Sequence, residues 1–559
     1  MKLTTALCLS LSLAAGFFVY LNALPNQFLW DDEEQIIANQ LIQSPANIPK
    51  LFLSSTGYMA GSDTTNGFYR PMMFMVYLIC YQIGKFTPWV YHFFQLAFHL
   101  ANITLLFFIF KQILSDLKIK PIKPIALTTT LIFALHPVIS EAVIYLGAIG
   151  EPLYAFFSLA SFLIFLKGIN YQKRAIKPFF LFSSLGLAFF GLFAKETAVV
   201  VFLLIFAYLL LFVKPKLEKL INYLFSFGAL FGFYLLIRLF IARVSFAQPH
   251  IVPIAQASLI SRLLTIPYEI VTYLSLVFWP EKLLIYRHFV IESPTEIRFL
   301  GSISGLIIVG IFLYLLIKRQ EKVKQKLLIF SLFWFIFTLL PALNIIPLNM
   351  TLAERWLYLP LAGLLFFLNL LILPIIYKLS KTIKIISLIF FLVLITVFFI
   401  RTMIRNSNWR SGLALYGHDI KFNQNNANLE NNYGVELFRT GNVKEAKDHF
   451  KKSVELEPNW AVSRNNLGAV FERENNLEQA LNQYQKAVEL SSYYLAYQNL
   501  PGILLKMDRR EEAKRFIEQQ ALPRFPGNAN LYLLLSQIYY QEGQTEISRA
   551  LTQKAHALK

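Results

Sequence analysis

Long runs of apolar residues fill the first 400 positions of the chain. The first run, Leu3 to Leu24, carries no charge and has the length that an α-helix needs to cross a bilayer. We interpret it as a retained anchor, because it is long for a signal-peptide core and no small-residue cleavage signal precedes Asp31. The other predicted spans are Trp89 to Phe110, Ile125 to His136, Ala142 to Leu166, Pro178 to Ala194, Thr197 to Val213, Leu220 to Ile237, Phe299 to Ile317, Leu327 to Ile346, Trp356 to Tyr377 and Ile385 to Ile400. The pattern predicts eleven membrane helices in a domain of residues 1–400.

Polar positions between these runs alternate in charge. With the N-terminus inside, the inner segments hold 20 basic and three acidic residues, a net charge of +17. The outer segments up to residue 400 carry −2 and the tail from Arg401 carries +4, which completes the chain's +19. Lys and Arg are enriched in cytoplasmic loops. The charge therefore orients a membrane protein, with its tail outside the cytoplasm, and does not mark a nucleic-acid-binding surface.

One apolar stretch, Leu263 to Trp279, does not fit the alternation. It is long enough to span, but Lys318 to Lys326 stay inside only if both ends of the stretch lie outside. We expect a re-entrant or interfacial helix at this position.

The tail repeats with a period of 34 residues. Equivalent pairs are Gly434 and Gly468, Ala446 and Ala480, and Phe450 and Tyr484. This spacing, with small residues where two helices cross, is typical of tetratricopeptide repeats, which stack into a groove that binds peptide. We predict about four repeats in residues 427–559 and a linker or half-repeat cap in residues 401–426. A spacer or a stabilising cap is the alternative role.

Composition narrows the class further. The chain is 56% hydrophobic and 15% charged, with 53 Phe, which excludes a disordered chain. The same composition excludes a disulfide scaffold, and the two cysteines, Cys8 and Cys80, lie in apolar runs and do not indicate a redox compartment. No Walker loop, dinucleotide glycine pattern, HExxH motif or zinc-spaced Cys and His set occurs, so soluble nucleotide chemistry is not indicated.

Four consecutive acids follow the first span, namely Asp31, Asp32, Glu33 and Glu34. Adjacent carboxylates repel one another, and ionisable groups at a membrane edge usually serve a site. We expect a catalytic base or a cation site here. An acidic marker of the outer face is the alternative.

Cations lie at other outer edges. Arg70 follows Tyr69 and precedes Pro71, and Arg355 follows Glu354, which we expect to be its charge partner. An arginine at this depth can bind a phosphate through two hydrogen bonds, although Arg70 could also extend to the interface as a structural residue.

Three further groups mark breaks between predicted helices. His136 precedes Pro137, and Glu141 follows five residues after His136. The alternative for His136 is a structural role, which is common for a lone histidine. Glu151 lies beside Pro152, which breaks the fourth span, and Lys195 and Glu196 form a corner where the pair could neutralise itself. All these groups are predicted at the outer leaflet, which suits a phosphate-bearing, lipid-linked substrate.

The ordered set resembles the transmembrane and tetratricopeptide repeat-containing O-mannosyltransferases, and more broadly the polytopic glycosyltransferases of the C-type fold. The matching pieces, in family order, are Asp31-Asp32, Tyr69-Arg70-Pro71, His136-Pro137 with Ser140-Glu141-Ala142-Val143, Ala194-Lys195-Glu196, Leu340-Pro341 with Asn344, and Ala353-Glu354-Arg355 with Tyr358-Leu359-Pro360. The chain departs from animal members at Gly150-Glu151-Pro152, where they carry Arg-Ala-Asp, and its repeat array is shorter.

The resemblance implies an all-α enzyme that transfers a sugar, with mannose as one candidate, from a polyprenyl-phosphate donor to a protein hydroxyl, inverting the anomeric carbon. It makes Asp31 the base with Asp32 beside it, and assigns Arg70, Lys195 and Arg355 to the phosphate and Glu141 and Glu354 to their orientation. The remaining site candidates are Tyr69, His136, Glu151, Glu196 and Tyr358. No cofactor is implied, and a divalent cation is not indicated.

Three alternatives stay open. The acceptor could be a cell-envelope lipid or glycan, the chain could be a non-enzymatic scaffold that recruits partners through its repeats, or it could be a transporter, which the scarcity of mid-membrane charges disfavours. The short tail and the missing lumenal retention signal favour a bacterial inner membrane with the repeats in the periplasm, or the endoplasmic reticulum lumen if the protein is eukaryotic.

Overall fold

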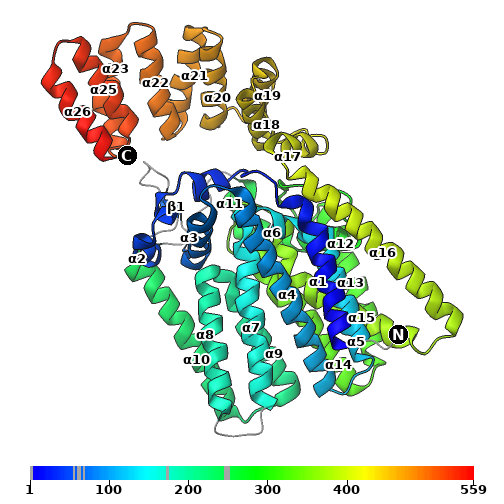
Figure 1. Cartoon of the computed structure of the whole chain (residues 1–559). Coiled ribbons are helices and arrows are strands. Elements are labelled where there is room, and N and C mark those ends of the chain that lie inside the picture. Colours follow the sequence, from blue (N-terminus) through cyan, green and yellow to red (C-terminus); the bar gives the residue numbers. More distant parts are fainter. Residues whose placement is uncertain are drawn as a thin grey trace. The chain divides into compact units, whose positions relative to one another are not determined.

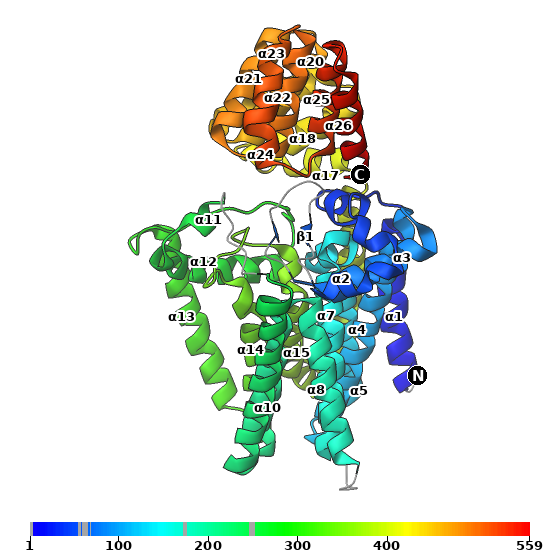
Figure 2. The same cartoon turned by 90° about the vertical axis from the view of Figure 1, so that its left-hand side faces the viewer.

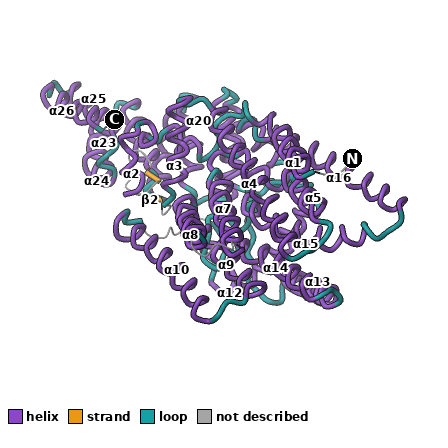
Figure 3. Tube along the Cα trace, turned by 60° about the horizontal axis from the view of Figure 1, so that its bottom comes forward, coloured by secondary structure: helices purple, strands orange, loops and turns teal. Residues whose placement is uncertain are grey.

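Helices make up almost all of the computed structural model, which describes residues 4–53, 57–58, 65–66, 69–170, 176–244 and 252–558. Figure 3 shows the near-absence of strands in this described part. Its helices and strands are α1 (Thr5–Tyr20), α2 (Ile48–Leu53), β1 (Gly57–Tyr58), β2 (Thr65–Asn66), α3 (Pro71–Gly84), α4 (Pro88–Asp116), α5 (Ile122–Leu135), α6 (Ser140–Ile144), α7 (Gly150–Asn170), α8 (Lys177–Ala194), α9 (Val200–Tyr208), α10 (Leu217–Leu236), α11 (Pro253–Gln256), α12 (Leu259–Phe278), α13 (Ile297–Lys318), α14 (Lys322–Leu339), α15 (Tyr358–Ile376), α16 (Lys381–Asn408), α17 (Gly412–Asp419), α18 (Ala427–Arg439), α19 (Val443–Leu456), α20 (Ala461–Arg473), α21 (Leu477–Leu490), α22 (Tyr494–Lys506), α23 (Arg510–Phe516), α24 (Leu522–Arg524), α25 (Ala529–Gln541) and α26 (Thr545–Ala557). Two compact units divide at Arg410 and Ser411.

The first unit is a bundle of apolar helices (Figure 1). Ten described helices are long and apolar enough to cross a membrane, or eleven if α5 counts together with 137–144, from which it is bent by 53°. The chain is an integral membrane protein, and the predicted all-α class with about eleven spans is confirmed. Lys2, Lys173 and Arg174, three of the basic residues predicted on the inner side, lie outside the described residues.

Helices α8 and α12 differ from the other long helices of the bundle. Helix α8, one of the eleven predicted spans, is shorter than the other candidates. Helix α12 is long enough to span, yet contacts from near both of its ends lie at one end of the bundle. Thr265 near its start accepts from the N–H of Ile291, in the segment before α13, and the carbonyl of Val277 near its end contacts His136, after α5. Figure 2 accordingly shows α12 lying across the axes of α10, α13 and α14.

Lipid-facing helices expose large apolar side chains. Only 6% of the apolar window of α13 and none of that of α16 is buried within the chain, whereas 83% of the window that contains α7 is buried. A helix that is apolar all round is stable at such an exposed position only in lipid. The core of the bundle therefore forms around α4, α7 and α15, and α10, α13 and α16 lie at its rim.

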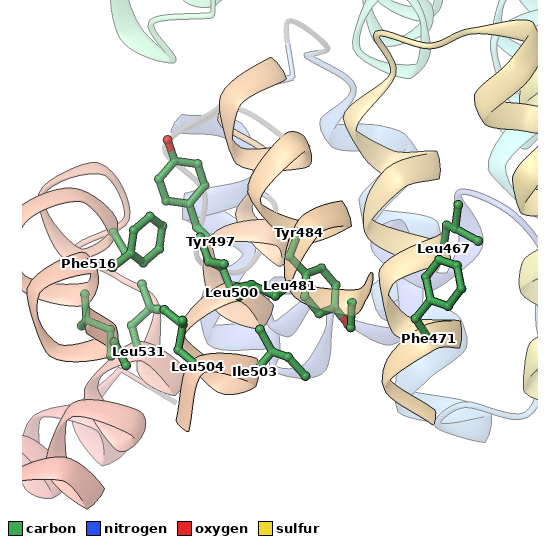
Figure 4. Close-up of a cluster of buried hydrophobic side chains, with 14 of the residues drawn as sticks. Leu467, Phe471, Leu481, Tyr484, Tyr497, Leu500, Ile503, Leu504, Phe516 and Leu531 are labelled. Carbon is green, nitrogen blue, oxygen red and sulfur yellow. The ribbon is translucent and has the colours of Figure 1, made fainter. Parts of the chain in front are cut away.

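The second unit stacks helix pairs. Helices α18 to α21 form two pairs, and α22 with α23 and α25 with α26 form two more, so the predicted repeats are confirmed. The small-residue positions explain the period. A Cβ on Gly434 would lie 2.8 Å from the ring of Phe450, and a Cβ on Gly468 would lie 2.8 Å from the ring of Tyr484. Figure 4 shows Tyr484 within the apolar side chains that join successive pairs.

Candidate active site

A cavity of about 160 Å³ opens at one end of the membrane bundle. Loops and helix ends surround it: the segment after α1, the start of α3, the break before α7, the corner between α8 and α9, and the segment before α15. Six of the predicted site residues line the cavity, namely Asp31, Arg70, Glu151, Lys195, Glu196 and Arg355. The structure thus brings together groups from five separate parts of the sequence.

Each cation of the cavity is held by one carboxylate. Arg70 donates to Glu196 from Nη2 at 3.0 Å and from Nε at 3.4 Å. Lys195 forms an ion pair with Glu151, and burial lowers the pKa of Lys195 while Glu151 opposes that shift. These pairs fix the cations in place, so little reorganisation is needed when an anion binds.

Arg355 is anchored by Glu141 in the same way. The Glu141 carboxylate accepts the backbone N–H of Arg355 at 3.0 Å and also pairs with its guanidinium. Glu141 is buried, and Arg355 reaches from it into the cavity. A guanidinium has five N–H donors, so this arginine can bind a phosphate while it stays paired.

Asp31 differs from the other acids. Among the described residues it is the one carboxylate of the cavity wall without an ion pair. Burial raises its pKa, and the Tyr145 hydroxyl and the charge of Arg355 partly oppose that shift. A buried carboxylate of raised pKa can accept a proton from a hydroxyl.

The adjacent Asp32 does not line the cavity. Its Oδ2 accepts the N–H of Leu29 at 2.9 Å and its Oδ1 accepts the N–H of Gly147 at 2.7 Å. Burial raises its pKa well above the ordinary value despite these two bonds. Asp32 therefore joins the loop after α1 to the turn before α7, and so orients Asp31.

Besides Asp32 and Glu141, four predicted site residues lie outside the cavity wall and have partners elsewhere. The Tyr69 hydroxyl donates to the Phe52 carbonyl at 2.6 Å. His136 contacts the Val277 carbonyl through Nε2 at 2.9 Å and accepts the Val138 N–H at 3.2 Å.

Glu354 and Tyr358 complete this group. Glu354 is fully buried between Arg405, at 3.3 Å, and Arg287, at 3.7 Å. The predicted charge pair of Glu354 with Arg355 is therefore wrong, because the packing places Glu141 against Arg355 instead. The Tyr358 hydroxyl contacts His99 Nδ1 at 2.8 Å. The contacts of all four residues shape the surroundings of the cavity rather than its wall.

Sequence reasoning missed a polar stripe on α4. The stripe consists of His92, Gln95, His99 and Asn102, which are all buried. Their spacing of three, four and three places them on one face of the helix. That spacing within an otherwise apolar span is the signal that could have revealed them.

Metal ligands are not gathered here. Within the described ranges, no group of three or more His, Cys, Asp or Glu side chains could hold a metal ion. The basic side chains that line the cavity in the described part of the chain are Arg70, Lys195 and Arg355.

The chain is similar to known proteins in both of its units. A tetratricopeptide repeat model matches residues 425–492. A protein O-mannosyl-transferase of Caenorhabditis elegans is 25% identical over 453 residues, which is 79% of this chain and 61% of that protein. Protein O-mannosyl-transferase TMTC3 of Homo sapiens is 24% identical over 482 residues, which is 79% of this chain and 50% of that protein.

A crystal structure of MamA aligns with 26% of this chain and 84% of its own at 22% identity and a TM-score of 0.24. The chain spans between half and about three-fifths of the length of the two mannosyl-transferases it matches. It resembles, over 79% of its own length, the tetratricopeptide repeat-containing protein O-mannosyl-transferases.

Proposed function

We propose that the protein is a membrane glycosyltransferase that moves one sugar from a polyprenyl-phosphate donor to a protein hydroxyl. The observation that carries the proposal is the unpaired carboxylate of Asp31 in a cavity with the three cations Arg70, Lys195 and Arg355. A hydroxyl acceptor requires a base, and a departing phosphate requires positive charge. Both requirements are met within one cavity.

The reaction is a single displacement. Asp31 takes the proton of the acceptor hydroxyl while the oxygen of that hydroxyl forms a bond to the anomeric carbon. The bond from that carbon to the phosphate oxygen breaks, and the polyprenyl phosphate leaves with the electron pair. Arg70, Lys195 and Arg355 stabilise the negative charge that develops on the leaving group. One displacement inverts the anomeric configuration.

The cavity faces the extracytoplasmic side in this proposal. The support is the charge pattern, since the basic loops of the chain belong to the opposite ends of the spans. The tail, whose repeats bind the acceptor polypeptide, lies on that side too. A bacterial inner membrane with a periplasmic tail is the setting we propose.

Replacing Asp31 tests the proposal directly. In the full-length protein in nanodiscs, Asp31→Asn removes the base without a large change of shape and should reduce sugar transfer by at least about 10²-fold. Glu34→Gln is the matched control, since this acid of the same cluster is exposed. Wild-type activity in Asp31→Asn would overturn the assignment.

The acceptor is tested separately. Mass spectrometry of envelope proteins and lipids, with and without the gene, identifies the missing sugar and the molecule that carried it. Removing residues 427–559 should abolish transfer to protein. If this deletion leaves a lipid or glycan modified as before, the acceptor is not a protein.

A further inference from the structure

The polar stripe of α4 contacts the segments that carry the site. His92 contacts the carbonyl of Asn26, in the segment between α1 and Asp31, at 3.2 Å. At 1.5 Å per residue, Asn102 lies about 15 Å further along the helix. The stripe therefore extends from the segment that precedes Asp31 into the bundle.

Gln95 holds the segment beside Asp31. Its amide donates to the carbonyls of Ala142 and Tyr145, both at 2.8 Å. These carbonyls lie at the end of α6, and that of Tyr145 also accepts the N–H of Ala148 at 3.0 Å. The same segment places the Tyr145 ring beside Asp31 and the Gly147 N–H on Asp32.

Asn102 contacts the two segments that carry Glu151 and Arg355, on which the proposed phosphate site depends. Its amide donates to the carbonyl of Pro152 at 2.8 Å and to the Tyr358 hydroxyl at 3.1 Å. Pro152 follows Glu151, which pairs with Lys195, and Tyr358 begins the helix that follows Arg355. One side chain thus connects the segments of two of the three cations.

Burying these amides has a cost unless they are hydrogen-bonded. Gln95 and Asn102 are both fully buried in a membrane helix. A bundle that needed only apolar packing would be at least as stable with Leu at either position. The contacts that their amide N–H groups make are at the breaks that carry the site.

We infer that Gln95 and Asn102 are positioning residues with separate effects: Gln95 sets the geometry of the base and Asn102 sets the geometry of the phosphate site. The inference rests on the proposed function. It predicts that loss of Gln95 slows the chemical step and that loss of Asn102 weakens donor binding, because a displacement of about 1 Å at a reacting group can change a rate by about 10²-fold.

The experiment compares Gln95→Leu and Asn102→Leu in the full-length protein in nanodiscs. Gln95→Leu should lower kcat at least about tenfold and leave the Kd and stoichiometry of the polyprenyl-phosphate carrier within about threefold of wild type. Asn102→Leu should raise the donor KM and the carrier Kd by about tenfold with a smaller change in kcat.

Two sets of variants separate positioning from misfolding. Gln95→Glu and Asn102→Asp keep the side-chain shape, lose the amide donors and should show the same split. Gln112→Leu is the matched control on α4, because the one described acceptor of the Gln112 amide is Asp116, at 2.8 Å, on the exposed surface. A misfolded fraction would lower the stoichiometry of carrier binding, which the inference expects to stay constant.

Equal effects of Gln95→Leu and Asn102→Leu on kcat and KM, or wild-type values in both, would overturn the inference. Failure of the proposed function looks different: the wild-type protein would then transfer no sugar from any polyprenyl-phosphate donor. In that case carrier binding still tests Asn102, and hydrogen exchange of residues 140–148 still tests whether Gln95 holds its segment.

Discussion

The backbone N–H of Gly147 donates a hydrogen bond of 2.7 Å to Oδ1 of Asp32. The bond joins residues 115 positions apart and gives the second acid of the pair a structural role. It also leaves Asp31 as the acid that faces the cavity.

Asp32→Asn should therefore destabilise the protein. An Asn offers one carboxamide oxygen, so one of the two N–H groups that Asp32 accepts would face an N–H₂ group instead. A buried unsatisfied donor costs about 1–3 kcal/mol, which thermal unfolding in detergent would detect as a lower Tm. Glu34→Gln is the control. An unchanged Tm with lost activity would show that Asp32 takes part in the chemistry.

The pH dependence of kcat should show the raised pKa of Asp31. A base works deprotonated, so activity falls as pH falls through its pKa. Burial raises that pKa, and the acid limb of the profile should therefore lie above the range of an exposed aspartate, about 3.9. Activity that stays constant down to that range would contradict the role of Asp31.

Tyr145→Phe should move this acid limb to still higher pH. The Tyr145 hydroxyl lowers the pKa of Asp31, whereas burial raises it. Without the hydroxyl, burial should raise this pKa further. Tyr154→Phe is the control, because Tyr154 lines the same cavity beside Lys195. A limb that both variants shift equally would assign the effect to the cavity as a whole.

Arg355 and Glu141 should act as one unit. Glu141→Gln removes the charge that holds Arg355, and both Glu141→Gln and Arg355→Gln should raise the donor KM by at least about tenfold. A double-mutant cycle should show coupling of about 0.5–3 kcal/mol. Arg439→Gln, on the surface of the repeats, is the control. Additive effects would mean that Glu141 does not position Arg355.

Small residues of the repeats should be required at two equivalent positions. Gly434→Ala and Gly468→Ala place a methyl group against the rings of Phe450 and Tyr484, at a cost of about 1–3 kcal/mol. Hydrogen exchange of residues 427–492 in the full chain should rise in both variants. Gly502→Ala is the control, since a Cβ at this position would meet no atom within 4 Å and Ala favours a helix. Protection that Gly434→Ala leaves intact would contradict the packing argument.

Part of the site could be found from the sequence because its residues break local rules. Several charged residues lie at the edges of apolar runs, namely Asp31, Glu151, Lys195 and Arg355. A charge is energetically unfavourable at such a position, so it usually marks a functional site. The stripe of α4 was missed because its members are uncharged and each one is unremarkable alone. Only their common spacing distinguishes them.

Hydropathy and a 34-residue period are local properties of the chain, so they were enough to predict the apolar membrane helices and the repeats. The orientation drawn from the loop charge stays a prediction. Which polar residues meet is a property of the folded bundle. Arg70 with Glu196 and Arg355 with Glu141 join positions 126 and 214 residues apart. Contacts at such separations depend on how the helices pack, and the same packing gave Asp31 and Asp32 different surroundings.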